Sequence, residues 1–453
     1  MALKSINPYT NRVIEEFEEF SYNIVDQVLN RSAATFETWK KSEAGLRRSL
    51  VLDLSRLLHE NADEYAASVT AEMGKPIAES KAEIEKCGWV CEYYSNNSED
   101  FLRSETVHTD ATESYVLFEP LGPVLGIMPW NFPFWQVFRF AVPTIMAGNT
   151  VLLKHASNVQ ICARHIENVF VKAGFPRGVF QNLVLGSDKI ENIIENDIVK
   201  AVSLTGSEPA GRKVAESAGR KIKKSLLELG GSNAFVVLDD ADLEKAAEIG
   251  IKARMMNAGQ SCIAAKRFIL HEKIAEQFIS LFAKRLQSLR SGDPARMDTD
   301  IGPLASIQQA ENVGKQVSRS VEMGARIITG GYPDGAFYPP TLLADVRPGM
   351  PVFDEEVFGP VAPVIIARDE AEAVALSNLS NFGLGVSLFT NDFEKAKDMI
   401  PKFNEGSVFI NALVKSDPRL PFGGIKRSGY GRELSIYGIR EFVNVKTVYI
   451  KKF

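Results

Sequence analysis

The sequence predicts an α/β protein with two domains, each built on a mainly parallel β-sheet. The chain has 453 residues, enough for two or three domains of ordinary size. Short runs rich in β-branched residues alternate with longer segments of helical periodicity, and this alternation occurs in two successive series. Because a crossover helix between two strands favours parallel pairing, the pattern indicates right-handed βαβ units.

The predicted elements begin with an amphipathic helix. Leucines recur at helical spacing from Ala44 until Gly74 and Pro76 interrupt the pattern. After Leu121 the first series of strands comprises PVLGIM, NTVLLK, QNLVLG, AVSLTG and NAFVVL. The helices between them include VQICARHIENVFVKAG and EPAGRKVAESAGRKI.

A second series of strands and helices follows. Its predicted strands are RFIL, ARIITG, PVIIAR, VSLFT and GSVFIN, and its helices are AEQFISLFAKRLQSL, QQAENVGKQVSRSVEMG and FEKAKDMIPKF. The segment LGGSN, from Leu229 to Asn233, interrupts the pattern, so we expect the domain boundary there. Two further segments, ESYVLFEPLG and the C-terminal EFVNVKTVYIKKF, alternate as strands do and predict a small sheet that reaches a neighbouring subunit.

The composition excludes several classes of function. The 52 basic and 57 acidic residues give a formal charge of −5, which does not indicate a nucleic-acid-binding protein. The N-terminus lacks the pattern of a secretory signal. Residues 123–148 carry Arg139 and three internal prolines, at positions 129, 133 and 143, which argues against a membrane span. Four unevenly spaced cysteines form no disulfide framework, so we expect a cytoplasmic protein.

Cys262 stands out among the cysteines as a candidate nucleophile. It lies in NAGQSCIAAKR among small polar residues, where a thiol is accessible. The thiolate is the nucleophilic form, and it needs a cation, a helix N-terminus or a base to form near neutral pH. A buried structural cysteine is the alternative, which the local sequence alone favours. Cys87, Cys91 and Cys162 are interpreted as core residues.

Glu228 and Asn131 are further candidates. Glu228 lies between leucines and glycines in SLLELGGSN, and partial desolvation there would raise the carboxyl pKa towards that of a general base. The alternative is a glutamate that points to water. Asn131, in MPWNFPF, either donates to a developing oxyanion or ties down its own turn.

Other kinds of site lack their patterns. The five histidines are scattered, so we expect no metal. The sequence contains no GxSxG elbow, Walker loop or GxGxxG fingerprint.

Seven motifs occur in one order over about 300 residues: PWNFP, VLLK, LTGS, LELGGSN, GQSC, EEVFGP and PFGG. This order resembles the NAD(P)-dependent aldehyde dehydrogenase superfamily, and the variants VLLKHASNV and KSDPRLPFGG are most similar to its succinate-semialdehyde dehydrogenase branch. The resemblance implies a Rossmann-like cofactor domain of residues 1–98 and 120–230. It also implies a catalytic domain of residues 231–430 and oligomerisation strands at residues 99–119 and 440–453.

The resemblance also implies catalytic roles. Cys262 would be the nucleophile, Glu228 the general base and Asn131 the oxyanion donor. A glutamate at position 228 is typical of members that release a free acid, so no coenzyme A is expected.

Cofactor contacts follow in the same way. The resemblance implies Trp130 beside the nicotinamide ribose, Lys154 on the adenine ribose, and Ser207 near the pyrophosphate at a helix start. It implies that Glu356 and Phe358 contact the nicotinamide ribose and ring.

Ser157 indicates the choice of cofactor. Members that prefer NAD commonly carry a glutamate there, which repels a 2′-phosphate. With Ser157 and Lys154 the phosphate meets a hydroxyl and a cation, so we expect NADP to be accepted, with NAD as the alternative.

Arg139 and Ser416 fall where semialdehyde enzymes bind the distal carboxylate. The alternative for Arg139 is an ion pair with an acidic neighbour. The second arginine of some relatives is replaced by Met256, and Arg419 could substitute for it, whereas Arg254 would point elsewhere on a helix.

The sequence therefore predicts a homodimeric or homotetrameric dehydrogenase for a small-molecule aldehyde, with succinate semialdehyde as the leading substrate and no membrane or nucleic-acid partner. Another ω-carboxy or aliphatic aldehyde is one alternative. A non-catalytic structural protein with the same fold is the other, and the presence of all three catalytic candidates argues against it.

Overall fold

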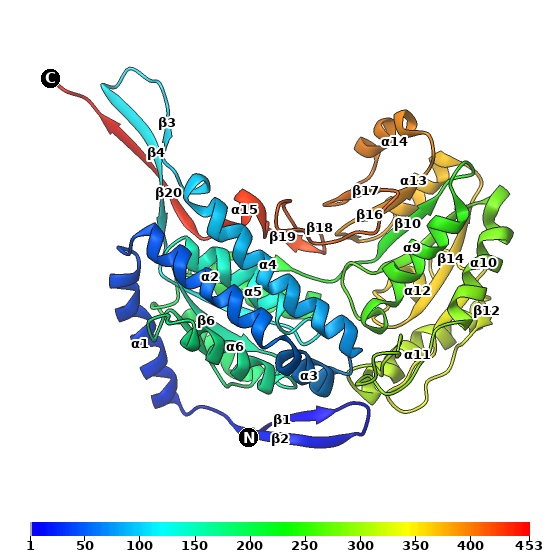
Figure 1. Cartoon of the computed structure of the whole chain (residues 1–453). Helices are drawn as coiled ribbons and strands as arrows, with labels where there is room; N and C mark the ends of the chain where they lie inside the picture. The colour runs from blue at the N-terminus through cyan, green and yellow to red at the C-terminus, as the bar shows by residue number, and fades with distance from the viewer. Residues whose placement is uncertain (1) are drawn as a thin grey trace.

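Two mainly parallel sheets dominate the structure, a computed structural model that describes residues 2–453 (Figure 1). The first is six-stranded, in the order β19-β9-β8-β5-β6-β7, and only β19 is antiparallel to its neighbour. Its strands are β5 (Pro123–Met128), β6 (Thr150–His155), β7 (Phe180–Asn182), β8 (Ala201–Thr205), β9 (Lys224–Glu228) and β19 (Gly429–Tyr430).

The first sheet is buried on both faces. Successive side chains of a strand point to opposite faces, and in β5 Val124 belongs to one hydrophobic cluster and Leu125 to another. Val151 and Leu152 of β6 divide in the same way. The near-continuous apolar runs in the sequence are therefore those of a parallel sheet covered by helices on both sides.

The helices of this half surround the first sheet (Figure 1). They are α1 (Tyr22–Trp39), α2 (Ala44–Glu60), α3 (Ala62–Met73), α4 (Ile77–Phe101), α5 (Trp135–Met146), α6 (Gln160–Lys172), η1 (Ser187–Lys189), α7 (Ile190–Glu195), α8 (Glu208–Arg220) and α15 (Ser435–Ile439).

The second sheet is seven-stranded, in the order β12-β13-β14-β11-β10-β16-β17, with only β12 antiparallel to its neighbour. Its strands are β10 (Asn233–Val237), β11 (Ala265–His271), β12 (Arg326–Thr329), β13 (Thr341–Ala344), β14 (Val361–Ala367), β16 (Val386–Phe389) and β17 (Val408–Ile410). Its helices are α9 (Leu243–Met255), η2 (Met256–Gly259), η3 (Glu272–Ile274), α10 (Ala275–Gln287), α11 (Ile307–Glu322), α12 (Pro351–Asp354), α13 (Glu370–Asn378), α14 (Phe393–Met399) and η4 (Ile400–Lys402). The α/β fold class with parallel sheets is thus confirmed.

The chain passes from the first sheet to the second across residues 229–232, between β9 and β10. It returns to the first sheet at β19, where Gly429 pairs with Glu228. A short antiparallel pair, β15 (Phe382–Gly383) and β18 (Ile425–Lys426), precedes this return.

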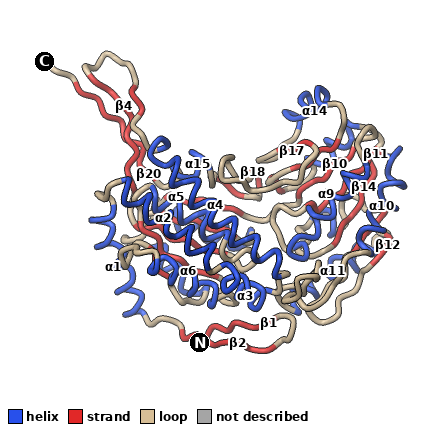
Figure 2. The backbone as a smooth tube through the Cα atoms, in the orientation of Figure 1, coloured by secondary structure: helices blue, strands red, loops and turns tan. Residues whose placement is uncertain are grey.

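A long antiparallel ribbon extends from the first half of the molecule (Figure 2). It consists of β4 (Glu113–Pro120) and β20 (Val443–Ile450), paired over the full length of both strands, with β3 (Glu105–Thr106) at the edge. Val445 and Tyr449 on β20 are exposed. At the N-terminus, β1 (Ala2–Asn7) and β2 (Arg12–Glu18) form a separate hairpin.

The structure differs from the sequence prediction at the first amphipathic helix. Two helices, α2 and α3, replace it, because Asn61 has φ −112° and ψ 20°, outside helical values. The prediction that Cys87, Cys91 and Cys162 are core residues is confirmed, since all three are fully buried. Within residues 2–453, no helix is both long enough and apolar enough to span a bilayer.

Candidate active site

The carboxyl ends of four neighbouring parallel strands carry residues that the sequence singled out. Glu228 ends β9, and Ser207 follows β8. Asn131 follows β5, and Lys154 is the next-to-last residue of β6. Because β9, β8, β5 and β6 are adjacent and parallel, these side chains lie along one edge of the sheet, where open α/β sheets bind their ligands.

Cys262 approaches this edge from the second half of the molecule. It lies in the loop between η2 and β11, and the three residues Asn257, Ala258 and Gly259 have φ between 50° and 75°, which turns the chain sharply before it. Asn131 Nδ2 donates to Gln260 O at 3.0 Å, and Asn257 Nδ2 donates to Asn131 O at 2.8 Å. These two hydrogen bonds join the loop that contains Cys262 to the segment after β5 of the first sheet.

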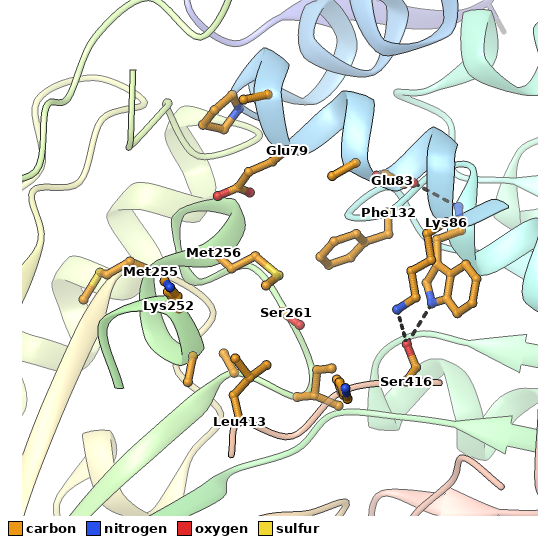
Figure 3. Close-up of a pocket in the computed structure, with 18 of the residues that line it drawn as sticks. Glu79, Glu83, Lys86, Phe132, Lys252, Met255, Met256, Ser261, Leu413 and Ser416 are labelled. Carbon is orange, nitrogen blue, oxygen red and sulfur yellow. Dashed lines mark hydrogen bonds between the residues drawn. The ribbon is translucent and has the colours of Figure 1, made fainter. Parts of the chain in front are cut away.

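A cavity of about 550 Å³ lies in front of this loop. Its walls come from α4 and α5 on one side and from the end of α9, η2 and the Cys262 loop on the other (Figure 3). Phe132, Trp135, Met256, Cys262 and Phe422 are among the residues that line it. The cavity is therefore mostly apolar, with a thiol in its wall.

The thiol of Cys262 is held in its neutral form by its surroundings. Burial raises its pKa to about 11, while the positive charges of Lys266 and Arg139 oppose the rise. Lys266 Nζ donates to Cys262 O at 2.9 Å. Deprotonation near neutral pH thus needs a base or a further positive charge beside the sulfur.

Glu228 lies close enough to Cys262 for its charge to affect that thiol. Its side chain is 2% exposed, and neither carboxylate oxygen has a hydrogen-bond partner among residues 2–453. Burial and repulsion from Glu433 raise the pKa of Glu228 well above its usual value. A Cβ at Gly423, in the PFGG motif, would lie 2.8 Å from Glu228 Oε1, so glycine there leaves room for the carboxylate. The expectation of a desolvated acid is confirmed, and the alternative of a water-exposed glutamate is wrong.

Arg139 is part of a buried ion pair. Its guanidinium contacts the carboxylate of Glu433, with side chains 1% and 3% exposed, and it stacks 4.6 Å from the centre of the Phe422 ring. The ion pair that was considered as the alternative for Arg139 is thus present, and Arg139 also lines the cavity. No motif singles out Glu433, because its importance arises from a contact distant in the sequence.

Asn131 retains hydrogen-bonding capacity. Its side chain is 4% exposed, one Nδ2 hydrogen goes to Gln260 O, and Oδ1 has no partner among residues 2–453. The second Nδ2 hydrogen is therefore available to an oxyanion formed beside Cys262.

The residues assigned to a cofactor fit an anionic ligand. Ser207 is the exposed N-cap of α8, and its side chain makes no capping hydrogen bond, so the first turn of the helix is open to an anion. Lys154 is 6% exposed, and burial lowers its pKa. Ser157 follows in the loop after β6, three residues beyond this buried cation. A buried cation and an open helix N-terminus at the same edge of the sheet are both features that phosphate groups would stabilise.

Glu356 and Phe358 lie on the side of the second sheet. Glu356 Oε1 accepts hydrogen bonds from Gly231 N at 3.0 Å and from Lys266 Nζ at 2.8 Å. Phe358 packs perpendicular to Trp130, with ring centres 5.7 Å apart. The sequence analysis did not anticipate Lys266, although it lies four residues after Cys262, at the start of a buried strand.

The three polar residues assigned to the substrate lie in different places. Ser416 is 5% exposed and lines the cavity, and its Oγ accepts hydrogen bonds from Lys86 Nζ at 2.8 Å and Trp135 Nε1 at 3.1 Å. Arg419 is not among the residues that line the cavity, and it pairs with Asp417 at 2.7 Å with its own side chain 64% exposed.

The segment before Cys262 contributes an apolar wall. Met256 lines the cavity, whereas Arg254, at the end of α9, is fully buried and donates to the backbone carbonyls of Val357 and Gly359. The expectation that Arg254 points elsewhere is confirmed. Among residues 2–453, no group of three or more His, Cys, Asp or Glu side chains is arranged to hold a metal ion.

Comparison with known proteins agrees with this arrangement. The chain is 47% identical over 453 residues to a probable succinate-semialdehyde dehydrogenase [NADP(+)] of Synechocystis sp., covering 99% of this chain and 100% of the relative. It is 45% identical over 456 residues to succinate-semialdehyde dehydrogenase [NADP(+)] 1 of Mycobacterium tuberculosis, covering 99% and 100%. The crystal structure of succinic semialdehyde dehydrogenase from Streptococcus pyogenes in complex with NADP+ superposes with a TM-score of 0.97 at 36% identity, over the full length of both chains. The aldehyde dehydrogenase family model matches residues 1–448, and the chain belongs to this family.

Proposed function

We propose that the protein oxidises succinate semialdehyde to succinate, with NADP as the preferred cofactor and NAD as the alternative. The observation that carries the proposal is a mostly apolar cavity with Cys262 in its wall and Arg139 and Ser416 at a polar end. The names of the relatives support the same substrate and cofactor.

The first half of the reaction takes place at Cys262. Its proton passes to solvent water, and the thiolate Sγ then forms a bond to the aldehyde carbon while the carbonyl π electrons move to oxygen. The resulting oxyanion accepts hydrogen bonds from the free Nδ2 hydrogen of Asn131 and from the Cys262 backbone N–H. Trp130, Glu356 and Phe358 would hold the nicotinamide, which would supply the acceptor for the hydride lost from that carbon, so that a thioester would remain on Cys262.

The second half depends on Glu228. In its ionised form it removes a proton from water as the water oxygen attacks the thioester carbon, and the carbon–sulfur bond then breaks to release the acid and the thiol. Burial, together with repulsion from Glu433, raises the pKa of Glu228 above its usual value, which makes its carboxylate a stronger base.

The cofactor would be held at the edge of the first sheet. Ser207 and the start of α8 would receive the pyrophosphate, and Lys154 with Ser157 the adenine ribose and its 2′-phosphate. Trp130, Glu356 and Phe358 would contact the nicotinamide end.

At the other end, the distal carboxylate of the substrate would meet Ser416 and the N–H donors of Arg139 that Glu433 does not use. A charge-assisted hydrogen bond here favours an ω-carboxy aldehyde over an alkyl one. Arg419, in the loop that follows Ser416, would act at the approach to the cavity.

The proposal also covers the oligomeric state of the protein and its compartment in the cell. β20 carries exposed apolar side chains, including Val445 and Tyr449, and within residues 2–453 its outer edge pairs with no strand. Such an edge is suited to pairing with another copy of the chain. We therefore propose a cytoplasmic homodimer or homotetramer.

Kinetics of cofactor reduction test the function. We would compare kcat/KM for succinate semialdehyde and butanal, each with NADP and with NAD. A preference of about a hundredfold for the semialdehyde supports the proposal. Equal values for the two aldehydes would remove the proposed substrate, and no activity in any combination would favour a non-catalytic role.

A further inference from the structure

A lysine that neither the sequence motifs nor the proposed chemistry uses lies at the polar end of the cavity. Lys86 belongs to α4, and its Nζ donates to Ser416 Oγ at 2.8 Å. The same atom lies 4.1 Å from the centre of the Trp135 ring. Figure 3 shows Lys86 and Ser416 together at one end of the cavity, with Met256 across from them.

The acidic side chains nearest to Lys86 are already paired with other cations. Glu83, on the same helix, pairs with Lys75, and Asp417 pairs with Arg419. Within the described range 2–453, no carboxylate forms an ion pair with Lys86. Its positive charge is therefore not balanced by a direct partner.

Arg139 and Lys415 also line the cavity. The charge of Arg139 is balanced by the buried carboxylate of Glu433, and Lys415 is exposed. Lys86 is thus the partly buried cation at this end that has no carboxylate partner within residues 2–453. An ammonium group that is partly buried without an anion is unfavourable, and a bound anion would relieve the cost.

The electrostatics agree with this geometry. Burial lowers the pKa of Lys86 to about 8, with repulsion from Arg139 acting in the same direction and the negative charges of Asp417 and Glu83 opposing it. The group is still mainly protonated at pH 7, and a carboxylate beside it would favour the charged form further.

Ser416 supplies the complementary donor. Its Oγ accepts hydrogen bonds from both Lys86 and Trp135, which occupy the two lone pairs of the hydroxyl. The hydroxyl hydrogen must then point away from both of them. One carboxylate oxygen placed there would receive the Ser416 O–H, and the second oxygen would lie near the Lys86 ammonium.

We propose that Lys86 is a further specificity-determining residue of the cavity, and that together with Ser416 and Arg139 it binds the distal carboxylate of an ω-carboxy aldehyde. The inference rests on the proposed function and adds to it the group that discriminates a carboxylate from a methyl end.

The test compares Lys86→Met with a matched control. Lys81→Met removes a lysine from the same helix that pairs with Asp63 at 2.7 Å and does not line the cavity. In Lys86→Met, kcat/KM for succinate semialdehyde should fall about 10- to 100-fold relative to that for butanal, mostly through KM, because one charged hydrogen bond is lost. Lys81→Met should keep the wild-type ratio, and Lys86→Arg should restore part of it.

A binding measurement makes the test independent of turnover. By isothermal titration calorimetry, succinate should bind Lys86→Met about 10- to 100-fold more weakly than wild type. Equal succinate affinities, or an unchanged ratio of the two kcat/KM values in a variant with wild-type thermal stability, would overturn the role of Lys86. Failure of the proposed function is distinguishable, because the wild type itself would then show no preference for succinate semialdehyde over butanal.

Discussion

The buried pair of Arg139 and Glu433 predicts a large effect of a single substitution. In Arg139→Leu the carboxylate of Glu433 stays buried beside Glu228 with no cation to balance it. Breaking a buried pair in this way costs about 3 to 5 kcal/mol. With an unfolding entropy of about 2.1 cal/mol/K per residue over the whole chain, 1 kcal/mol corresponds to about 1 °C, so Tm should fall by about 3 to 5 °C.

The loss should depend on pH. Burial raises the pKa of Glu433, and Arg139 opposes that rise, so removing the arginine raises the pKa further. A carboxyl whose pKa is higher in the folded state binds more protons there than in the unfolded state, and stability then falls as pH rises above the unfolded value. Differential scanning calorimetry should therefore show a larger deficit for Arg139→Leu at pH 8 than at pH 5.5.

Two variants provide controls for this prediction. Arg56→Leu breaks an exposed pair with Glu60 on α2 and should leave Tm unchanged. The double variant Arg139→Leu/Glu433→Leu removes both charges and should recover part of the lost stability. A Tm within 1 °C of wild type for Arg139→Leu (about 1 kcal/mol or less), or a double variant less stable than the single one, would refute the reasoning.

Three further predictions concern the chemistry. Iodoacetamide should inactivate the cofactor-free enzyme about tenfold faster for each pH unit between 7 and 9, because burial raises the thiol pKa of Cys262 to about 11. A plateau of the inactivation rate below pH 8 would contradict this. The control variant Cys262→Ala should be inactive and should not be labelled. Glu228→Gln should give a burst of reduced cofactor followed by accumulation of an acyl-enzyme detectable by mass spectrometry, whereas an unchanged steady rate would assign water activation to another group. Ser157→Glu should lower kcat/KM with NADP about 10- to 100-fold, through loss of a phosphate contact and added repulsion, without lowering that with NAD; equal changes with both cofactors would argue against a role in cofactor choice.

The secondary structure could be predicted where periodicity is strong. The apolar runs of β5, β6, β8 and β10 and the amphipathic patterns of α6 and α10 depend on local sequence, and the structure contains all of them. The break at Asn61 between α2 and α3 was missed, because leucines continue at nearly helical spacing across it. The N-terminal hairpin of β1 and β2 was missed as well.

Some residues of the candidate site could likewise be predicted from the sequence, and others could not. Cys262, Glu228 and Asn131 lie in motifs with unusual local composition, so the sequence could single them out. Lys86 and Glu433 could not be identified, because one faces a loop and the other an arginine that lie far away along the chain. The importance of each depends on which charges are paired after folding: Glu433 pairs with Arg139, whereas Lys86 has no carboxylate partner within residues 2–453.

Asn131 and Cys262 belong to opposite halves of the molecule. Reciprocal hydrogen bonds between Asn131 and the loop of Gln260 and Asn257 connect the two halves at this point. Asn131 and Cys262 are far apart in the sequence, so their relative position depends on the contacts between the two halves. Partial separation of the halves would therefore abolish turnover while both sheets remain folded. Enzyme activity in mild denaturant is accordingly expected to decline before the loss of secondary structure, and to report how firmly the two halves are joined.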